Sequence, residues 1–369
     1  MSNLSLRHYF QLQYVAPDQG VRACRAPSMG MTTISLRALM TAPRIIHISD
    51  LHFIDPNSPG TMTLGGFRKN DSVLRSELIA SFLIGNRPIL AGPGGATVVI
   101  TGDLTDSGDD ADYQFAQTLI GRLRACRFNV YVTPGNHDYC REGVLALGTK
   151  VDHIQRRQRF NKYILLNYAG NYSTENYTNP VAGVGDTEYP RYADIEGGRL
   201  ILLDSMQGEL DQEREGDGDN KGQGKLGKYQ LQALGNAIND YQSQRQIGKK
   251  LVVCLHHAPL EVYNAKPGWD GLLDDYASLL GCISGTGGKS KIDCLLFGHT
   301  GDTQDRYGSE EQKHSIALIN SENLEDVDES KGQPYAITVL DLGTYRRLVF
   351  QTNDANAMHP APTWGNPTA

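Results

Sequence analysis

Short runs of apolar, often β-branched residues recur along the chain, and polar residues follow each run at once. Five runs show this most clearly: RIIHIS (44–49), ATVVIT (96–101), NVYVTP (129–134), KLVVCL (250–255) and IDCLLF (292–297). Continuous apolar runs of this length are typical of strands that lie buried within a sheet. We therefore predict five buried strands, each ending in a polar loop.

Stretches with helical periodicity separate some of these runs, and they cover residues 71–86, 111–126, 150–168 and 229–245. Alternation of strands and helices is typical of the α/β class. Near the end of the chain, YAITVLDL and RRLVFQTN predict a hairpin of two strands. The segment 205–228 is rich in glycine and charge, which predicts a long loop, either a solvated linker or a lid beside a site.

The strand-bearing part of the chain, residues 44–353, is predicted to be one domain. Residues 1–43 precede it as an irregular N-terminal extension, and residues 354–369 follow it as an irregular, Pro-containing tail. The first 43 residues carry several arginines and lack the apolar core of a secretory signal. No apolar run approaches the roughly 20 residues that a membrane span needs, so no membrane association is expected.

The cysteines indicate the cellular compartment in which the protein is expected, and the net charge limits the classes of partner that it is expected to bind. The six cysteines form no C-x-x-C pair, and Cys254 and Cys294 lie inside apolar runs, where a free thiol packs as a small hydrophobic group. This usage predicts a reducing, cytoplasmic location. The net charge of −7 disfavours binding of nucleic acid through a basic face. An anionic substrate stays compatible, because bound metal ions reverse the local field.

The polar residues after the strands form a set of candidate metal ligands. In open α/β sheets, ligands bind where the carboxyl ends of strands meet their loops. Asp50 and His52 are two residues apart and project to one side, and a carboxylate such as Asp103 can bridge two cations. The mixture of oxygen and nitrogen donors suits Mn, Fe or Zn rather than Ca. The candidates are Asp50, His52, Asp103, Asn136, His257 and His299.

The ordered motifs D-x-H, G-D-x-x-D, G-N-H-D, H-x-P and G-H resemble those of the calcineurin-like metallophosphoesterase superfamily. The resemblance is greatest to its cyclic-nucleotide and glycerophosphodiester phosphodiesterase branch. The stretches HISDLHF, VVITGDLTDSG and VTPGNHDY carry most of it, and it extends over residues 44–345. It implies an α/β fold in which a two-sheet mixed β-sandwich is flanked by helices.

The resemblance also implies a role for each candidate ligand. Asp50 and His52 would bind a first metal ion, Asp103 would bridge, and Asn136, one histidine of HHAP and His299 would bind a second. Family members commonly read H-x-P, which selects His257. His256 would then lie on the other face of the strand, because side chains alternate along strands.

By the same resemblance, Asn136 and His137 would contact the phosphate. His137 would donate a proton to the leaving oxygen or stabilise charge. Asp106 would orient His137, and it is also a candidate for capping a helix or turn. One departure is that the branch usually reads G-H-x-H, whereas this chain reads GHTGD, with Gly301 in place of the second histidine. A weaker first metal site is expected.

The implied function is metal-dependent hydrolysis of a small phosphodiester, with a metal-bound hydroxide as nucleophile. The sequence contains no G-x-S-x-G, P-loop or reactive cysteine motif, so no covalent intermediate is expected. A phosphomonoesterase or protein phosphatase is the alternative on the same site. A nuclease is disfavoured by the negative charge. A non-catalytic binding protein is a further alternative, and metal analysis of purified protein would distinguish it.

Overall fold

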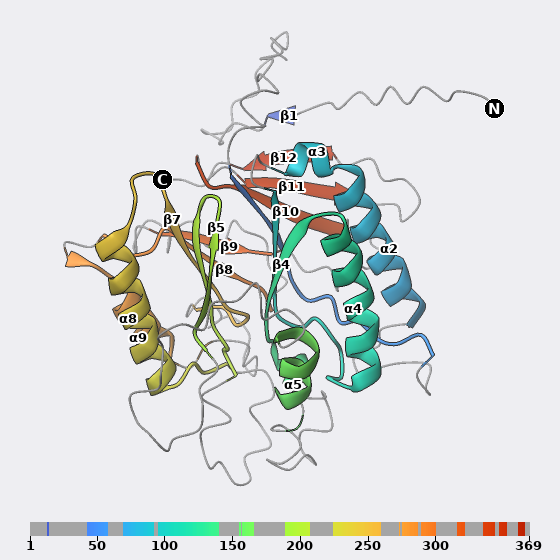
Figure 1. Ribbon diagram of the computed structural model, residues 1–369, viewed down its shortest axis with the longest axis horizontal. Helices are drawn as coiled ribbons and strands as arrows, with labels where there is room; N and C mark the ends of the chain where they lie inside the picture. The colour runs from blue at the N-terminus through green and yellow to red at the C-terminus, as the bar shows by residue number, and fades with distance from the viewer. Residues whose placement is uncertain are drawn as a thin grey trace, which may run out of the picture.

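Two mixed β-sheets form the centre of the protein. The computed structural model describes residues 13–14, 43–57, 69–91, 95–139, 155, 157–165, 189–206, 224–259, 273, 275–286, 289–299, 316–321, 335–343, 347–352 and 361–365. Figure 1 shows helices α2, α3 and α4 on one side of the strands and α8 and α9 on the other. This arrangement confirms the predicted α/β fold of two mixed sheets flanked by helices.

The larger sheet has seven strands. In spatial order they are β1 (Gln13–Tyr14), β12 (Ala361–Gly365), β11 (Arg347–Thr352), β10 (Tyr335–Asp341), β2 (Arg44–Ile48), β3 (Ala96–Thr101) and β4 (Phe128–Thr133). Strands β2, β3 and β4 are parallel to one another. Strand β10 runs antiparallel to both β2 and β11, which confirms the predicted hairpin.

The smaller sheet has five strands. Their order is β5 (Arg191–Ile195), β6 (Gly198–Leu202), β7 (Lys250–Cys254), β8 (Cys294–Phe297) and β9 (Ala317–Asn320). Strands β6 to β9 are parallel, and β5 runs antiparallel to β6. The sequence predicted β7 and β8, whereas β5, β6 and β9 were not among the predicted strands.

Helices α2, α4 and α8 begin and end within two residues of the ranges predicted from the sequence. The described helices are α2 (Lys69–Gly85), α3 (Arg87–Leu90), α4 (Asp110–Ala125), α5 (Asn136–Tyr139), the π-helix η1 (Asn161–Leu165), α8 (Lys228–Gln244) and α9 (Tyr276–Ile283). The predicted helix 150–168 is described only in part, and its described residues are helical. No described helix is long and apolar enough to cross a membrane.

Strand β7 shows why strands of the smaller sheet appear in the sequence as continuous apolar runs. Val252 and Cys254 belong to the apolar layer that the two sheets share. Leu251 and Val253 point the other way, into a second apolar cluster with α8 and α9. Both faces of the strand are therefore covered, as is usual for parallel strands. The polar residues can gather only where the strands end.

The two terminal segments differ from expectation in one respect. Each was predicted to be irregular, yet β1 lies in the first and β12 in the second, and the two strands pair in parallel. Strand β12, APTWG, was not apparent because Pro362 and Gly365 disfavour strands in sequence patterns. The domain limits otherwise stay predictions. The segment 205–228, predicted to be a loop that serves as a linker or a lid, is described only at its ends.

Candidate metal centre

The candidate ligands come from loops at the carboxyl ends of strands in both sheets. We call the loops after β2, β3 and β4 the first-sheet half, and the loops after β6, β7 and β8 the second-sheet half. The two halves are in direct contact, because Nε2 of His256 lies 3.2 Å from Oδ2 of Asp103. Every site residue predicted from the sequence lies in this region, as does His256.

Asp50 and His52 are held against the loop that follows β3. The Asp50 amide donates to the Gly102 carbonyl at 3.1 Å, and the His52 amide donates to the Asp103 carbonyl at 2.9 Å. These bonds bring Nε2 of His52 to 3.6 Å from Oδ2 of Asp103 and 4.0 Å from Oδ1 of Asp50. Two buried carboxylates therefore flank one imidazole nitrogen.

The backbone at these positions is strained. Asp50, His52 and Asp103 have φ values of 55°, 42° and 46°, and His299 has 71°. Arg127 is the one other non-glycine residue with positive φ in the described part of the chain. Side chains other than glycine avoid this region, and such residues persist only where their surroundings hold them, often at functional sites. The strain thus coincides with the predicted ligands.

His256 lies at the meeting point of the two halves. Its Nε2 is 3.0 Å from Oδ1 of Asn136, 3.1 Å from Nδ1 of His299 and 3.2 Å from Oδ2 of Asp103. Its Nδ1 is 2.7 Å from the Thr101 carbonyl, so this nitrogen carries the hydrogen. Three ligand atoms from three separate loops therefore converge on one ring nitrogen.

The expectation that His256 faces away from the site is wrong. Strand β7 ends at Cys254, so strict alternation of side chains does not continue through the two histidines. His257 instead places Nδ1 2.7 Å from Oγ of Ser205, and its ring meets that of His299 at a centroid distance of 4.6 Å. Both histidines of HHAP therefore belong to the cluster. The selection of His257 as a ligand stays a prediction.

His137 and Asp106 lie together beside His52. The His137 amide donates to Oδ1 of Asp103 at 2.8 Å, and its Nδ1 is 3.0 Å from the Asp106 carbonyl. Oδ1 of Asp106 is 3.6 Å from Nδ1 of both His137 and His52. Asp106 is therefore placed to orient two imidazoles rather than one. The N-cap of the following helix α4 is Asp109, not Asp106.

Burial and the charges of neighbouring groups shift the pKa values of the site residues, upward for some and downward for others. Burial raises the pKa of Asp50, and the Asp103 charge adds to this. Burial also opposes ionisation of Asp103, but the charges of His256 and His137 outweigh it and hold that pKa well below its usual range. Burial would lower the pKa of His256, yet Asp103 raises it to about 9. Burial and the charge of His256 lower the pKa of the neighbouring His299 to about 3, so Asp103 favours its ionised form, His256 its protonated form and His299 its neutral form.

Two glycines permit the close approach of the loops. A Cβ atom at Gly135, in G-N-H-D, would overlap the Asp103 carboxylate and amide. A Cβ atom at Gly298, in G-H, would overlap Oγ of Ser49 and Oδ2 of Asp50. These motif glycines are thus required by the packing of one loop on the next.

Three residues that contact the predicted ligands or hold their loops were not predicted as site residues from the sequence. His256 is the first, and the second is Asp138, whose carboxylate accepts from the amides of Leu104 at 3.2 Å, Thr105 at 3.0 Å and Gly135 at 3.0 Å. The third is Ser205. The run RLILLDS is a further apolar run followed at once by polar residues, so the same pattern that revealed the other loops could have revealed this one.

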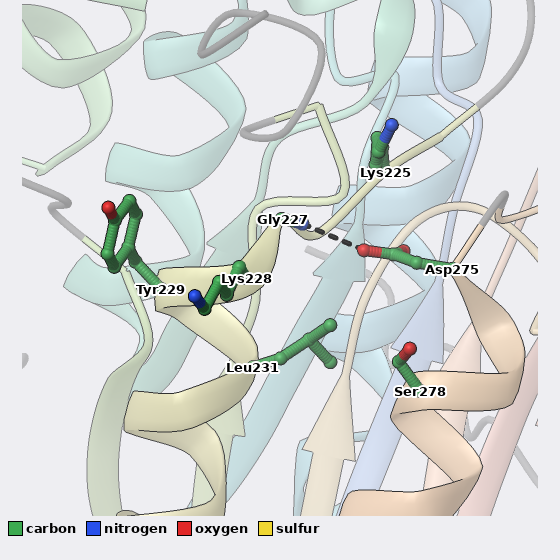
Figure 2. Close-up of a pocket in the computed structure, with 7 residues that line it drawn as sticks. All are labelled: Lys225, Gly227, Lys228, Tyr229, Leu231, Asp275 and Ser278. Atoms are coloured by element: carbon green, nitrogen blue, oxygen red, sulfur yellow. Dashed lines mark hydrogen bonds between the residues drawn. The ribbon is translucent and has the colours of Figure 1, made fainter.

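A cavity of about 530 Å³ lies beside the second-sheet half, between the first turns of α8 and α9 (Figure 2). Gly224 packs on the His257 ring, and the next residue, Lys225, lines the cavity. The Asp275 carboxylate accepts from the amides of Leu226 at 3.0 Å and Gly227 at 2.9 Å. The lining residues are Lys225, Gly227, Lys228, Tyr229, Leu231, Asp275 and Ser278.

The donor set fits divalent or trivalent metal ions of the Mn, Fe and Zn type. Three groups of donors have their ligand atoms within 4.8 Å of one another: Asp50, Asp103, His256 and His299; His256, His257 and His299; His52, Asp103 and His137. Buried carboxylate oxygens and imidazole nitrogens are the ligands that these ions prefer. Gly301 lies outside the described residues, so the expected weak site stays a prediction.

The sequence matches the family model of the calcineurin-like phosphoesterases over residues 43–303, which is more than half of the chain. The protein therefore belongs to this family, whose reaction class is phosphoester hydrolysis. The match is to the family as a whole and selects no branch. No curated protein matches the sequence.

Several solved structures are similar to this chain. A dimetal phosphatase from Danio rerio is 13% identical, with 84% of this chain and 96% of that chain covered and a TM-score of 0.49. A purple acid phosphatase from yellow lupin (Lupinus luteus) seeds is 10% identical, with 88% of this chain and 54% of that chain covered and a TM-score of 0.43. A phosphopantetheinyl hydrolase from Mycobacterium tuberculosis is 14% identical, with 70% and 83% covered and a TM-score of 0.32.

Proposed function

We propose that this protein is a metal-dependent phosphoester hydrolase of the cytoplasm that acts on small phosphodiesters. One observation carries the proposal: Oδ2 of Asp103 lies 3.6 Å from Nε2 of His52 and 3.2 Å from Nε2 of His256. The Asp103 carboxylate thus lies between candidate ligands from both halves, where it would be shared by two cations.

The residues of the two halves would together hold two cations. Asp50, His52 and Asp103 would hold the first. Asp103 would share the second with Asn136, His299 and a histidine of HHAP, and the contacts of His256 favour it over His257. When bound, such cations neutralise developing charge on phosphoryl oxygens and make water more acidic.

His137 is placed to supply a proton to the leaving alcohol. Its Nδ1 is 3.0 Å from the Asp106 carbonyl, so Nδ1 keeps a hydrogen and Nε2 is the atom left to face substrate. Burial works against protonation, but the Asp103 and Asp106 charges raise the pKa of His137 above its usual value. The imidazolium form, which can donate from Nε2, therefore persists to higher pH than in an unperturbed histidine.

The preference for diesters rests on the resemblance of the sequence motifs to those of the phosphodiesterase branch. A diester carries a second organic group on phosphorus. No candidate metal ligand lines the cavity that begins at Lys225, so that cavity does not decide between diester and monoester. The net charge of −7 supports a small phosphoester rather than nucleic acid as the partner.

The test is a comparison of bis(p-nitrophenyl) phosphate with p-nitrophenyl phosphate. Protein dialysed against chelator is reconstituted with Mn, Zn or Fe, and metal content is measured beside kcat/KM. A higher kcat/KM for the diester is expected. Faster hydrolysis of the monoester would make the protein a phosphomonoesterase. Absence of bound metal together with no hydrolysis of either ester would indicate a non-catalytic binding protein.

A further inference from the structure

Two consecutive residues after β6 contact both halves of the centre. The Tyr139 hydroxyl donates to Oδ2 of Asp204 at 3.1 Å. Tyr139 is the last residue of α5, the short helix that begins at Asn136. The neighbouring Ser205 places Oγ 2.7 Å from Nδ1 of His257. One loop of the smaller sheet therefore bonds the helix that carries Asn136 and also a histidine of the other half.

This loop is itself held in place by α8. Nε2 of Gln230 donates to the Asp204 carbonyl at 2.7 Å, and Oε1 of Gln230 accepts from the Asp204 amide at 2.8 Å. The Met206 amide donates to Oδ1 of Asp204 at 2.8 Å, so each carboxylate oxygen has a donor. Because Gln230 and Met206 hold Asp204 in place, Asp204 is a rigid support for Tyr139.

The contact between Tyr139 and Asp204 is fully enclosed, and both residues are 0% exposed. Burial raises the pKa of Tyr139 well above its usual value, and the Asp204 charge adds to this, so the hydroxyl stays protonated and donates. A hydrogen bond to a buried carboxylate is stronger than one between neutral groups, and its loss leaves the charge poorly compensated.

We propose that Asp204 and Ser205 are positioning residues that set the spacing of the two halves, Asp204 through Tyr139 and Ser205 through His257. The proposal rests on the phosphoesterase function proposed above. Neither residue needs to contact substrate. Small displacements of catalytic groups slow turnover strongly because the reacting atoms lose alignment. Loss of the support should therefore lower kcat more than it changes KM.

The first test compares Tyr139→Phe with Tyr241→Phe. The control removes a similar hydroxyl, which donates to the Lys250 carbonyl at 3.1 Å from a residue 8% exposed and packed away from the centre. Both variants should lower the unfolding temperature. Only Tyr139→Phe should lower kcat, by about 10- to 100-fold as for partners of metal ligands, with KM nearly unchanged. Equal kcat in the two variants would overturn the proposal.

The second test combines Tyr139→Phe with Ser205→Ala. Because both bonds act through one loop, the loss of kcat in the double variant should be smaller than the product of the single losses. Strictly multiplicative losses would mean that the two bonds act independently, against a shared support.

A third measurement separates this proposal from the proposed function. If the wild type hydrolyses no phosphoester, the proposed function fails, and Mn affinity measured by calorimetry then decides the positioning role. Affinity lowered about tenfold or more in Tyr139→Phe, but not in Tyr241→Phe, supports it. Equal affinity in the two variants contradicts it.

Discussion

The first-sheet half and the second-sheet half of the centre are built by different means. In the first-sheet half, backbone amides hold the carboxylates: His137 donates to Asp103, and three amides donate to Asp138. In the second-sheet half, the rings themselves are oriented by side-chain contacts: Nδ1 of His256 lies 2.7 Å from the Thr101 carbonyl, and Nδ1 of His257 lies 2.7 Å from Oγ of Ser205. The geometry of the first-sheet half therefore depends on the backbone of its loops. The geometry of the second-sheet half depends on the orientation of individual imidazole rings.

This difference predicts how substitutions in each half lower activity. In the first-sheet half, a change that leaves the backbone intact acts through charge or through proton transfer. In the second-sheet half, the neighbouring imidazoles of His256 and His257 pack edge to face, with ring centroids 4.9 Å apart, so a change in one ring acts through the position of the other. The predictions below separate these effects.

The largest effect is expected from Asp103→Asn. The substitution keeps the shape of the side chain but removes the charge that faces both halves, so kcat should fall to the uncatalysed background. Asp240→Asn, at an exposed position on α8, is the matched control and should retain full activity. Measured kcat near the wild-type value in metal-replete buffer would contradict the bridging role of Asp103.

His137→Ala should lower kcat by about 10²- to 10⁴-fold for an ester with a poor leaving group, because a general acid contributes this much. The loss should shrink for p-nitrophenyl esters, whose leaving group needs no proton. Metal content should stay unchanged. A loss of equal size across leaving groups would point instead to charge stabilisation by His137.

The two histidines of HHAP should differ. His256 contacts three ligand atoms from three loops, so His256→Ala should weaken metal binding more than His257→Ala, by about tenfold or more. Metal stoichiometry and Mn titration of activity measure this. The reverse order would restore His257 as the principal ligand and show that the ring contacts of His256 serve packing.

The smallest effect concerns stability and pH in the first-sheet half. Asp112 accepts from the Asp55 amide at 2.8 Å and from the Ser107 hydroxyl at 2.5 Å, which ties the D-x-H loop to α4. Burial raises the pKa of Asp112, and the hydrogen bond from Ser107 only partly opposes this. The raised folded-state pKa means that its contribution is full below the unfolded value of about 3.9 and is lost as pH rises through the folded value.

Asp112→Asn should therefore flatten the dependence of unfolding free energy on pH above about pH 4. Urea denaturation of chelator-treated protein at several pH values measures the slope, with Asp240→Asn again as control. An unchanged slope would show that Asp112 does not carry the shifted pKa in the folded protein.

Much of the fold and of the first-sheet half could be predicted because the signals are local. A buried strand followed by G-D or G-N-H places each side chain within a few residues of a strand end, and the helices followed from periodicity. The choice between His256 and His257 was not local. It depends on where β7 ends and on the Ser205 contact, which comes from a loop 52 residues earlier in the chain. The strand Arg191–Ile195 was missed because its polar residues break the apolar pattern.

The bond between the His299 amide and Oδ2 of Asp50 has a consequence for the order of folding. It joins residues 249 positions apart. Closing so large a loop costs chain entropy, and contacts of this kind form late. A nascent chain that has not yet emerged past β8 would hold Asp50 without its partner and could not assemble the centre. Hydrolytic competence would thus arrive with the last parallel strands of the smaller sheet, which keeps an unfinished chain inert.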